Sequence, residues 1–304
     1  MRSLNWIVST LRQAISATVE QDMRFDDVKM NQGILLARLN EKKESKHLKD
    51  HEFKIFSQWG EDGIIQRLIS VLAIKNKTFI EFGVEDFFES NCRYLMMKDN
   101  WSGFVIDGSA HNIAKLKQSY FYWRYDLASL NAFITRENIN DLLAKSGFGE
   151  DLGILSIDLD GNDYHILEAI GFFKPRILIC EYNAVFGAER EITVPYDAGF
   201  VQIAAHYSTL YCGASLGALT RLAEKKGYSL VGTNTAGNNA FFVRNDLLND
   251  QIEVLSVEEA FTPSKFRSSR DKEGNLSYIS GDRRFELIKG LPVFNVEKNV
   301  IESL

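Results

Sequence analysis

Two short apolar segments, each with an acid or a glycine near its end, constrain the fold of this chain most. Residues 78–84 read Thr-Phe-Ile-Glu-Phe-Gly-Val, and residues 103–108 read Gly-Phe-Val-Ile-Asp-Gly. β-branched and aromatic runs of this length, closed by a turn glycine, are typical of buried parallel strands. An acid that ends the second strand is placed to accept hydrogen bonds from the two hydroxyls of a ribose. The pair therefore predicts half of a nucleotide-binding site.

The loop after the first segment indicates which ligand this site takes. Residues 85–91 read Glu-Asp-Phe-Phe-Glu-Ser-Asn and lack the further glycines through which backbone amides approach a pyrophosphate. The three acids of this loop would satisfy the N-terminus of the following helix and repel a phosphate. S-adenosylmethionine, which is cationic and carries no phosphate, fits such a loop better. The alternative is an ordinary αβ turn in which Glu81 and Asp107 are merely solvated.

Composition allows one large domain or two smaller ones and argues against some partners. The chain has 304 residues, of which 45% are hydrophobic, and a formal net charge of -6. No basic stripe is interleaved with aromatic residues, so we expect no nucleic-acid partner. The cysteines are odd in number and far apart, which argues against a disulfide framework and favours a cytoplasmic location. No apolar stretch is long enough to cross a bilayer.

The N-terminal part, residues 1–50, reads as a helical appendage made of two helical segments and a charged linker. Leu4, Ile7, Leu11 and Ile15 fall on one face of the first segment. We expect this face to pack on its own domain. The alternatives are contact with a membrane surface and a homo-oligomer formed through the N-terminal helices.

Residues 51–246 predict the main α/β domain. Five strands alternate with helical patterns, which indicates a parallel sheet with helices on both faces. A direct turn joins the last two strands, so the final strand should run antiparallel to its neighbour. This is the Rossmann-like sheet of class I methyltransferases. Residues 247–304 read as an irregular C-terminal extension packed on the domain. The expected strands lie near 78–84, 102–107, 121–126, 152–159, 176–182, 228–232 and 240–244.

Acidic residues cluster where the fourth and fifth strands end. The two-residue period of a strand places Asp158 and Asp160 on one side, and it places Glu181 and Asn183 on one side of the next strand. Carboxylate and amide oxygens are the ligands that Mg²⁺ prefers. We therefore expect a metal site at Asp160, Glu181 and Asn183 beside Asp158. The alternative is that Asp158 contacts the cosubstrate or a backbone amide and that Asp160 belongs to a turn.

Two histidines are candidates for general-base work together with Asp158 and Asp160. His165 follows the fourth strand, and His206 lies in the aromatic-rich segment 184–217. A long connection at the ligand-binding edge usually forms a lid or a substrate wall, and this is the role we expect for the segment. The alternative for each histidine is a purely structural role.

Taken together, several segments resemble a bacterial group related to the FkbM-type S-adenosylmethionine-dependent methyltransferases. The resemblance covers roughly residues 56–245. The segments that carry it are residues 57–63, 80–85, 100–109, 156–164, 181–183 and 236–244.

The resemblance implies a role for each matching position of the cosubstrate site. Glu81 and Gly83 would lie beside the methionine part, Asp107 would bind the ribose, and Asp126 would lie on the adenine side after the third strand. Asp158 would be the acid nearest the transferred methyl group. Glu85 stands where the family has a second glycine. The remaining residues assigned to this site are Asn91, Gly108 and Ser109.

The resemblance also implies an activity. Relatives of the FkbM type methylate hydroxyls of sugars or natural products, and some sugar O-methyltransferases of this fold use Mg²⁺. We therefore expect an O-methyltransferase that acts on a small-molecule or saccharide hydroxyl. One alternative is a non-catalytic scaffold protein, suggested by Glu85 and the N-terminal helices. Another is a nicotinamide oxidoreductase, which the glycine-poor loop disfavours.

Overall fold

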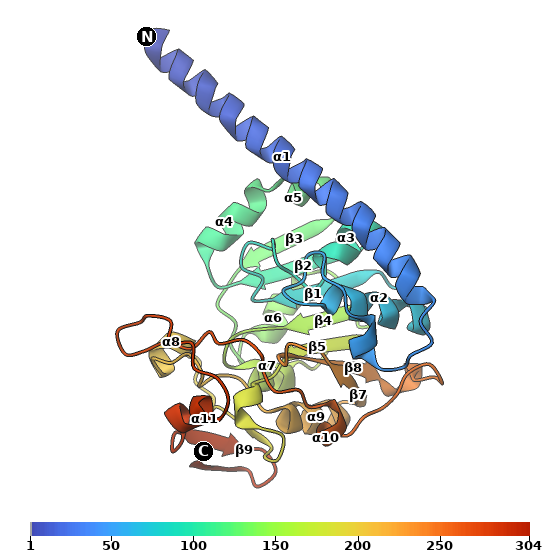
Figure 1. Ribbon diagram of the computed structural model, residues 1–304, viewed down its shortest axis with the longest axis vertical. Helices are drawn as coiled ribbons and strands as arrows, with labels where there is room; N and C mark the ends of the chain where they lie inside the picture. Colours follow the sequence, from blue (N-terminus) through green and yellow to red (C-terminus); the bar gives the residue numbers. More distant parts are fainter. Residues whose placement is uncertain (1) are drawn as a thin grey trace.

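The computed structural model describes the backbone of residues 2–304 and the side chains of residues 21–304. A seven-stranded sheet with the order β3-β2-β1-β4-β5-β8-β7 forms its centre (Figure 1). The strands are β1 (Thr78–Phe82), β2 (Ser102–Asp107), β3 (Leu127–Asn131), β4 (Ile154–Ile157), β5 (Ile177–Glu181), β7 (Tyr228–Thr233) and β8 (Asn239–Arg244).

The pairing directions confirm the predicted methyltransferase-like topology. β1 lies parallel to both β2 and β4, whereas β8 lies antiparallel to both β5 and β7. The strand order reverses between β1 and β4, since β2 and β3 extend the sheet on one side and β4 and β5 extend it on the other. In sheets of this kind, ligands bind beyond the carboxyl ends of the strands at such a reversal.

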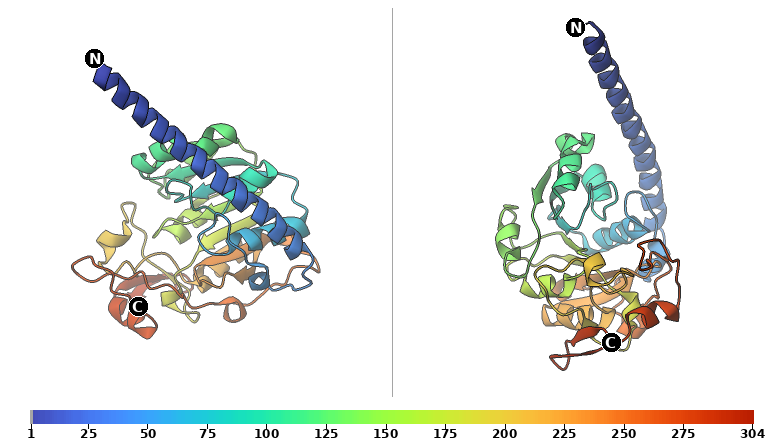
Figure 2. Two further views of the ribbon diagram at one scale, coloured as in Figure 1. Left: turned by 45° about the horizontal axis from the view of Figure 1, so that its top comes forward. Right: turned by 90° about the vertical axis from the view of Figure 1, so that its left-hand side faces the viewer.

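Helices cover both faces of the sheet, as the strand alternation predicts (Figures 1 and 2). Ile80 and Phe82 face one core, and Phe79 and Val105 face the other. The first core is covered by α6 (Ile139–Ala144), α7 (Asp163–Ala169) and α9 (Leu216–Lys225). The second is covered by α2 (Glu61–Leu72), α3 (Arg93–Asp99), α4 (Ala110–Gln118) and α5 (Tyr120–Arg124).

The N-terminal region forms one continuous helix, α1 (Arg2–Glu41), so the expectation of two segments is wrong. No proline interrupts it, and at Gly33 the helix packs closely on the body, since a Cβ there would lie 2.7 Å from the Tyr94 ring. The second half of α1 packs on the body through a buried ion pair between Asp26 and Arg93. The first half projects beyond the body (Figures 1 and 2). The stripe formed by residues 4, 7, 11 and 15 lies outside the described side chains.

The third strand begins later than predicted. Residues 120–124, an aromatic run that favours a strand by composition, form α5 instead. Tyr120 and Phe121 are buried on one side of this helical turn, while Trp123 is 72% exposed on the other. Packing of these aromatic side chains therefore overrides the local strand preference. Asp126 consequently precedes β3 rather than following it.

The C-terminal extension is more regular than expected. β9 (Pro292–Asn295) pairs with both β10 (Val300–Ser303) and β6 (Ile192–Thr193) in a second, three-stranded sheet. The extension also contains η3 (Asn245–Leu247), α10 (Val257–Ala260) and α11 (Asp282–Ile288). The long segment after β5 contains η2 (Ala184–Phe186) and α8 (Gln202–Ala205), and η1 (Leu48–His51) precedes α2. Within the described chain, no helix combines the length and the apolar character that a bilayer span requires.

Candidate active site

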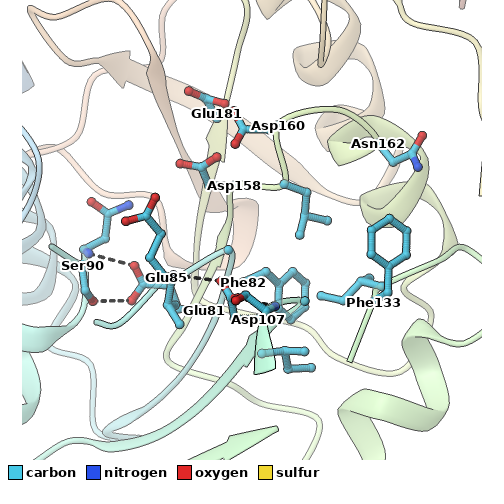
Figure 3. A pocket seen from close by; sticks show the side chains of 18 of the residues that line it. Glu81, Phe82, Glu85, Ser90, Asp107, Phe133, Asp158, Asp160, Asn162 and Glu181 are labelled. Atoms are coloured by element: carbon cyan, nitrogen blue, oxygen red, sulfur yellow. Dashed lines mark hydrogen bonds between the residues drawn. The ribbon is translucent and has the colours of Figure 1, made fainter. Parts of the chain in front are cut away.

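A cavity of about 630 Å³ opens at the carboxyl ends of β1, β2 and β4, where the strand order reverses (Figure 3). Its volume lies within the range of small-molecule sites. Its walls include most of the residues assigned to the cosubstrate from the sequence. These are Glu81, Gly83, Glu85, Asn91, Asp107, Gly108, Ser109 and Asp158.

Gly83 closes β1 at a place where no side chain fits. Its φ of +67° lies in the left-handed region, and a Cβ there would come within 1.7 Å of the Asp158 carbonyl oxygen. Its amide donates to the Ile106 carbonyl at 3.0 Å. The glycine therefore lets β1 and β4 approach closely and leaves the floor of the cavity free.

Glu81 anchors the loop that follows β1. Its buried carboxylate accepts hydrogen bonds from the Ser90 hydroxyl at 2.7 Å and from the Asn91 amide at 2.8 Å. Burial raises the pKa of Glu81, which these bonds partly offset. The Asn91 side chain in turn donates to the Ser156 hydroxyl at 3.1 Å. Glu81 and Asn91 thus fix the shape of the loop on the cavity wall.

Asp107 ends β2 and lies on the cavity wall, with only 8% of its surface exposed (Figure 3). One carboxylate oxygen accepts from the Glu85 amide at 2.9 Å, and the other accepts from the Ser109 amide at 2.7 Å. The oxygen bound by the Glu85 amide keeps a second lone pair for a ligand hydroxyl. The other oxygen also receives a long contact, 3.5 Å, from the Asn112 side-chain amide, which a ligand hydroxyl would replace. Two backbone amides therefore hold Asp107 in a fixed orientation suited to a ribose diol.

Glu85 has a backbone conformation that glycine favours, at the position where the resemblance leads us to expect a glycine. Its φ of +48° lies in the left-handed region, and its amide bonds to Asp107. The departure from the pattern thus changes the side chain at this position while the turn itself persists.

Asp126 is not part of the cavity, so its expected place on the adenine side is wrong. It lies before β3, at the edge of the sheet formed by the amino ends of the strands, which is opposite the cavity. There it is exposed and accepts a hydrogen bond from the Ser102 hydroxyl. The residues that follow β3 are apolar and do line the cavity. They are Ala132, Phe133 and Ile134.

The predicted convergence of strand-end acids is present at Asp158, Asp160 and Glu181 (Figure 3). One carboxylate oxygen from each lies within 4.8 Å of the others. The cause differs from the expected strand period, because β4 ends at Ile157 and Asp160 adopts a left-handed φ of +52°. Asp163 fixes this turn by accepting from the amides of Leu159 at 2.8 Å and Gly161 at 3.1 Å.

The electrostatics of this carboxylate cluster require a counter-charge or protons. Burial, followed by repulsion from Asp160, holds the pKa of Asp158 well above its usual range. Burial and the neighbouring Asp158 do the same for the pKa of Glu181, and burial raises the pKa of Asp160. Among residues 21–304, no Lys, Arg or His forms an ion pair with these three acids. The cluster can therefore share protons or hold a cation.

Asn183 has a structural role, which corrects its assignment as a metal ligand. Its amide oxygen accepts from the Val185 amide at 3.0 Å. Its nitrogen donates to the carbonyls of Leu210 and Cys212, both at 2.9 Å. The side chain therefore holds the segment after β5 against the end of the strand.

Neither candidate histidine lines the cavity, so the general-base role expected for both is wrong. His165 is buried, and its Nε2 lies 2.9 Å from the Val194 carbonyl oxygen. His206 places its Nδ1 2.7 Å from the Ser208 hydroxyl. Burial lowers the pKa of both imidazoles. Both rings belong to the packing of the segment around 184–217.

Sequence reasoning missed Gln58, which lies on the cavity wall. Asp62 positions its loop, because one Asp62 oxygen accepts from the amides of residues 55, 56 and 57 at 2.7, 2.8 and 2.8 Å. The segment 57–63 carried the family resemblance, but its sequence gave no reason to place it at the site. Other wall residues that were missed are Phe133, Asn162 and Asn239, whereas Phe200 and Val201 come from the segment 184–217, for which a wall role was expected.

No family model matches this chain, and no curated protein matches it. Solved structures that are similar include an O-methyltransferase from Bacillus cereus in complex with SAH, with a TM-score of 0.41 and 10% identity over 71% of this chain and 89% of that one. An S-adenosylmethionine-dependent methyltransferase from Clostridium acetobutylicum has a TM-score of 0.40 and 8% identity over 60% and 90%. An O-methyltransferase family protein from Burkholderia thailandensis has a TM-score of 0.38 and 10% identity over 60% and 58%. The chain thus spans less than two thirds of the Burkholderia protein. Because these TM-scores lie below 0.5, the fold is assigned from the strand order and register of this chain alone.

Proposed function

We propose that this protein is an S-adenosylmethionine-dependent O-methyltransferase that acts on a hydroxyl of a saccharide or glycan precursor. One observation carries the proposal: the cavity at the strand reversal is acidic. Seven acids line it, and no Lys, Arg or His of the described residues does. Such a wall repels phosphate groups and favours a cationic nucleoside.

The wall residues fit each part of this cosubstrate. The fixed carboxylate of Asp107 suits the ribose diol, and the apolar residues after β3, with Phe133 among them, suit the adenine. Asp158 lies on the cavity wall, and its negative charge would stabilise a sulfonium bound there. Bound S-adenosylmethionine supplies an electrophilic methyl group, and the electron pair of the broken C–S bond stays on sulfur as the acceptor oxygen bonds to carbon.

The carboxylate cluster supplies the remaining chemistry. As the acceptor oxygen forms its new bond, its hydroxyl proton must leave, and Asp158, Asp160 or Glu181 can take it because all three lie on the cavity wall. If Mg²⁺ occupies the cluster, these three acids would hold it and the ion would lower the pKa of the acceptor hydroxyl. Activity measured with EDTA and with added Mg²⁺ separates the two forms of the mechanism.

Methyl transfer can be tested with S-adenosylmethionine and a panel of saccharides, with formation of S-adenosylhomocysteine as the readout. We expect turnover with at least one hydroxylated saccharide, strongly reduced in Asp158→Asn. Asp126→Asn is the matched control, because this acid lies at the opposite edge of the sheet. Cosubstrate binding without turnover on any saccharide would refute the assigned substrate class.

A role in assembly is favoured by one further observation. Four large apolar side chains of α1 are 60–65% exposed, and their spacing of three, seven and four residues matches a coiled-coil stripe. They are Phe25, Val28, Leu35 and Leu39. We infer that α1 pairs with α1 of a second copy of the chain. Sedimentation of the full chain should give a dimer that Leu35→Glu dissociates, and a monomeric wild-type chain would contradict the pairing.

A further inference from the structure

A second cavity of about 400 Å³ adjoins the first one. Gln58, Asp160 and Glu181 line both cavities, so the carboxylate cluster lies where the two meet. The far wall comes from the C-terminal extension, which the Arg270 amide ties to the Ser208 carbonyl at 3.2 Å. The first cavity has the features of a nucleoside site, and the second cavity shares two of its acids, Asp160 and Glu181.

Arg284, on α11, is the unusual residue of this second cavity. It is only 7% exposed, and its buried Nε has no hydrogen-bond partner. No acid of the described residues forms an ion pair with its guanidinium, which lies over the Phe266 ring with 5.7 Å between its Cζ and the ring centroid. A buried cation without a partner is costly, and burial lowers the pKa of Arg284 accordingly. An anion bound in the cavity would remove this cost.

Two aromatic rings flank the same cavity. Trp59 and Phe266 both line it and stack with ring centroids 5.8 Å apart and planes inclined by 14°. Trp59 remains 40% exposed. A flat apolar surface beside polar groups suits the face of a sugar ring, whose C–H bonds pack on aromatic carbon.

The charges of the cavity would orient its ligand. Asp160 and Glu181 lie at the end that meets the first cavity, whereas Arg284 and Arg270 belong to the C-terminal extension. Arg270 already donates to the Gly274 carbonyl at 2.8 Å, so Arg284 is the donor that lacks a partner. An anionic group would therefore lie at Arg284 and be repelled from the acids, which leaves a hydroxyl to face them.

We propose that the second cavity is the acceptor subsite and that it takes a hydroxylated sugar ring bearing an anionic group, a carboxylate or a phosphate, which pairs with Arg284. This inference rests on the proposed function, because it places the acceptor hydroxyl next to the methyl donor. On transfer, the hydroxyl oxygen bonds to the methyl carbon, and its proton passes to the carboxylate cluster.

Calorimetry on the full chain saturated with S-adenosylhomocysteine tests the inference with three probes: glucuronate, glucose 6-phosphate and glucose. We expect at least one of the two anionic sugars to bind at least about tenfold more tightly than glucose, because a charge-assisted bond distinguishes them. The comparison of glucuronate with glucose 6-phosphate identifies the anionic group. Equal affinities for all three sugars, or no binding of either anion, would overturn the inference.

Variants locate the binding. Arg284→Gln should remove the preference for the anion, and Arg284→Lys should keep part of it. Arg283→Gln is the matched control, since Arg283 is exposed and lies outside the cavity wall. A preference that survives in a folded Arg284→Gln protein would overturn the inference. If this variant does not fold, the wild-type comparison and Arg284→Lys decide the question.

The same samples separate this inference from the proposed function. Binding of S-adenosylhomocysteine without any preference for anionic sugars overturns the acceptor subsite alone. A preference for anionic sugars without binding of S-adenosylhomocysteine or S-adenosylmethionine refutes the methyltransferase proposal and leaves an Arg284 anion site.

Discussion

Asp107→Ala is the substitution that most directly probes the ribose-binding role proposed for the end of β2. The carboxylate has two oxygens, and each already accepts one backbone amide, from Glu85 and Ser109. The substitution removes the acceptors for the ribose diol and also leaves these two amides without their partner. We therefore expect weaker cosubstrate binding and a looser turn after β1.

The magnitude follows from the number of hydrogen bonds lost. A hydrogen bond to a charged group contributes about 1.5–3 kcal/mol, and the ribose would make two of them. Water entering the vacated space offsets part of the loss, so we expect about 2–4 kcal/mol in total. Since each 1.4 kcal/mol is a factor of ten, the Kd should rise roughly 30- to 700-fold.

Isothermal titration with S-adenosylhomocysteine measures this change, and Asp126→Ala is the matched control. The sequence resemblance assigns both acids to the cosubstrate, but the structure places Asp126 at the opposite edge of the sheet. Asp126→Ala should therefore leave the Kd within about twofold, well below the tenfold that 1.4 kcal/mol represents. An unchanged Kd in Asp107→Ala, or an equal loss in both variants, would refute the reasoning.

Three further predictions concern stability. Gly83→Ala forces a left-handed φ on alanine and a clash with the Asp158 carbonyl, so it should lower the free energy of unfolding, measured in urea, by about 2–5 kcal/mol. An unchanged urea midpoint would contradict the close approach of β1 and β4. Asp26→Asn leaves the buried Arg93 without its ion pair and should cost about 3–5 kcal/mol in the same assay, whereas the exposed neighbour Asp27→Asn should change little. With EDTA present to remove any divalent ion, the free energy of unfolding should fall as the pH rises from about 4 to 8. The raised pKa values of the carboxylate cluster make the native state retain protons that the unfolded state releases. Asp160→Asn should flatten this fall, and a slope identical to that of the wild-type chain would show that the cluster does not cause it.

The sheet was largely predictable because its strands carry strong local signals. Residues 78–82 and 102–107 are short apolar runs bounded by turn residues, and they form β1 and β2 as expected. The terminal hairpin was predictable from its turn. β3 was not, because Leu-Ala-Ser-Leu-Asn carries little strand signal, while the aromatic run before it resembles a strand and packs as a helix. That single shift accounts for the misplacement of Asp126.

The site was predictable where backbone topology alone places a residue. Gly83, Asp107 and Asp158 each close or follow a strand at one edge of the sheet, so their meeting follows from the strand order. The prediction of a general-base role for the two histidines was wrong because that role depends on where the side chain points. Spacing along the sequence does not specify this direction. Arg284 could not be placed at the site from the sequence because it lies over one hundred residues from β5, and spacing along the chain does not specify so distant a contact.

The most direct test of the central claim is a calorimetric comparison of S-adenosylhomocysteine with NADH on the full wild-type chain. The acidic wall of the cavity predicts saturable binding of S-adenosylhomocysteine and S-adenosylmethionine, with NADH at least about one hundredfold weaker, since its pyrophosphate would face a wall lined by acids and by no basic residue of the described chain. NADH binding as tight as that of S-adenosylhomocysteine, or no binding of either S-adenosyl compound, would contradict the account.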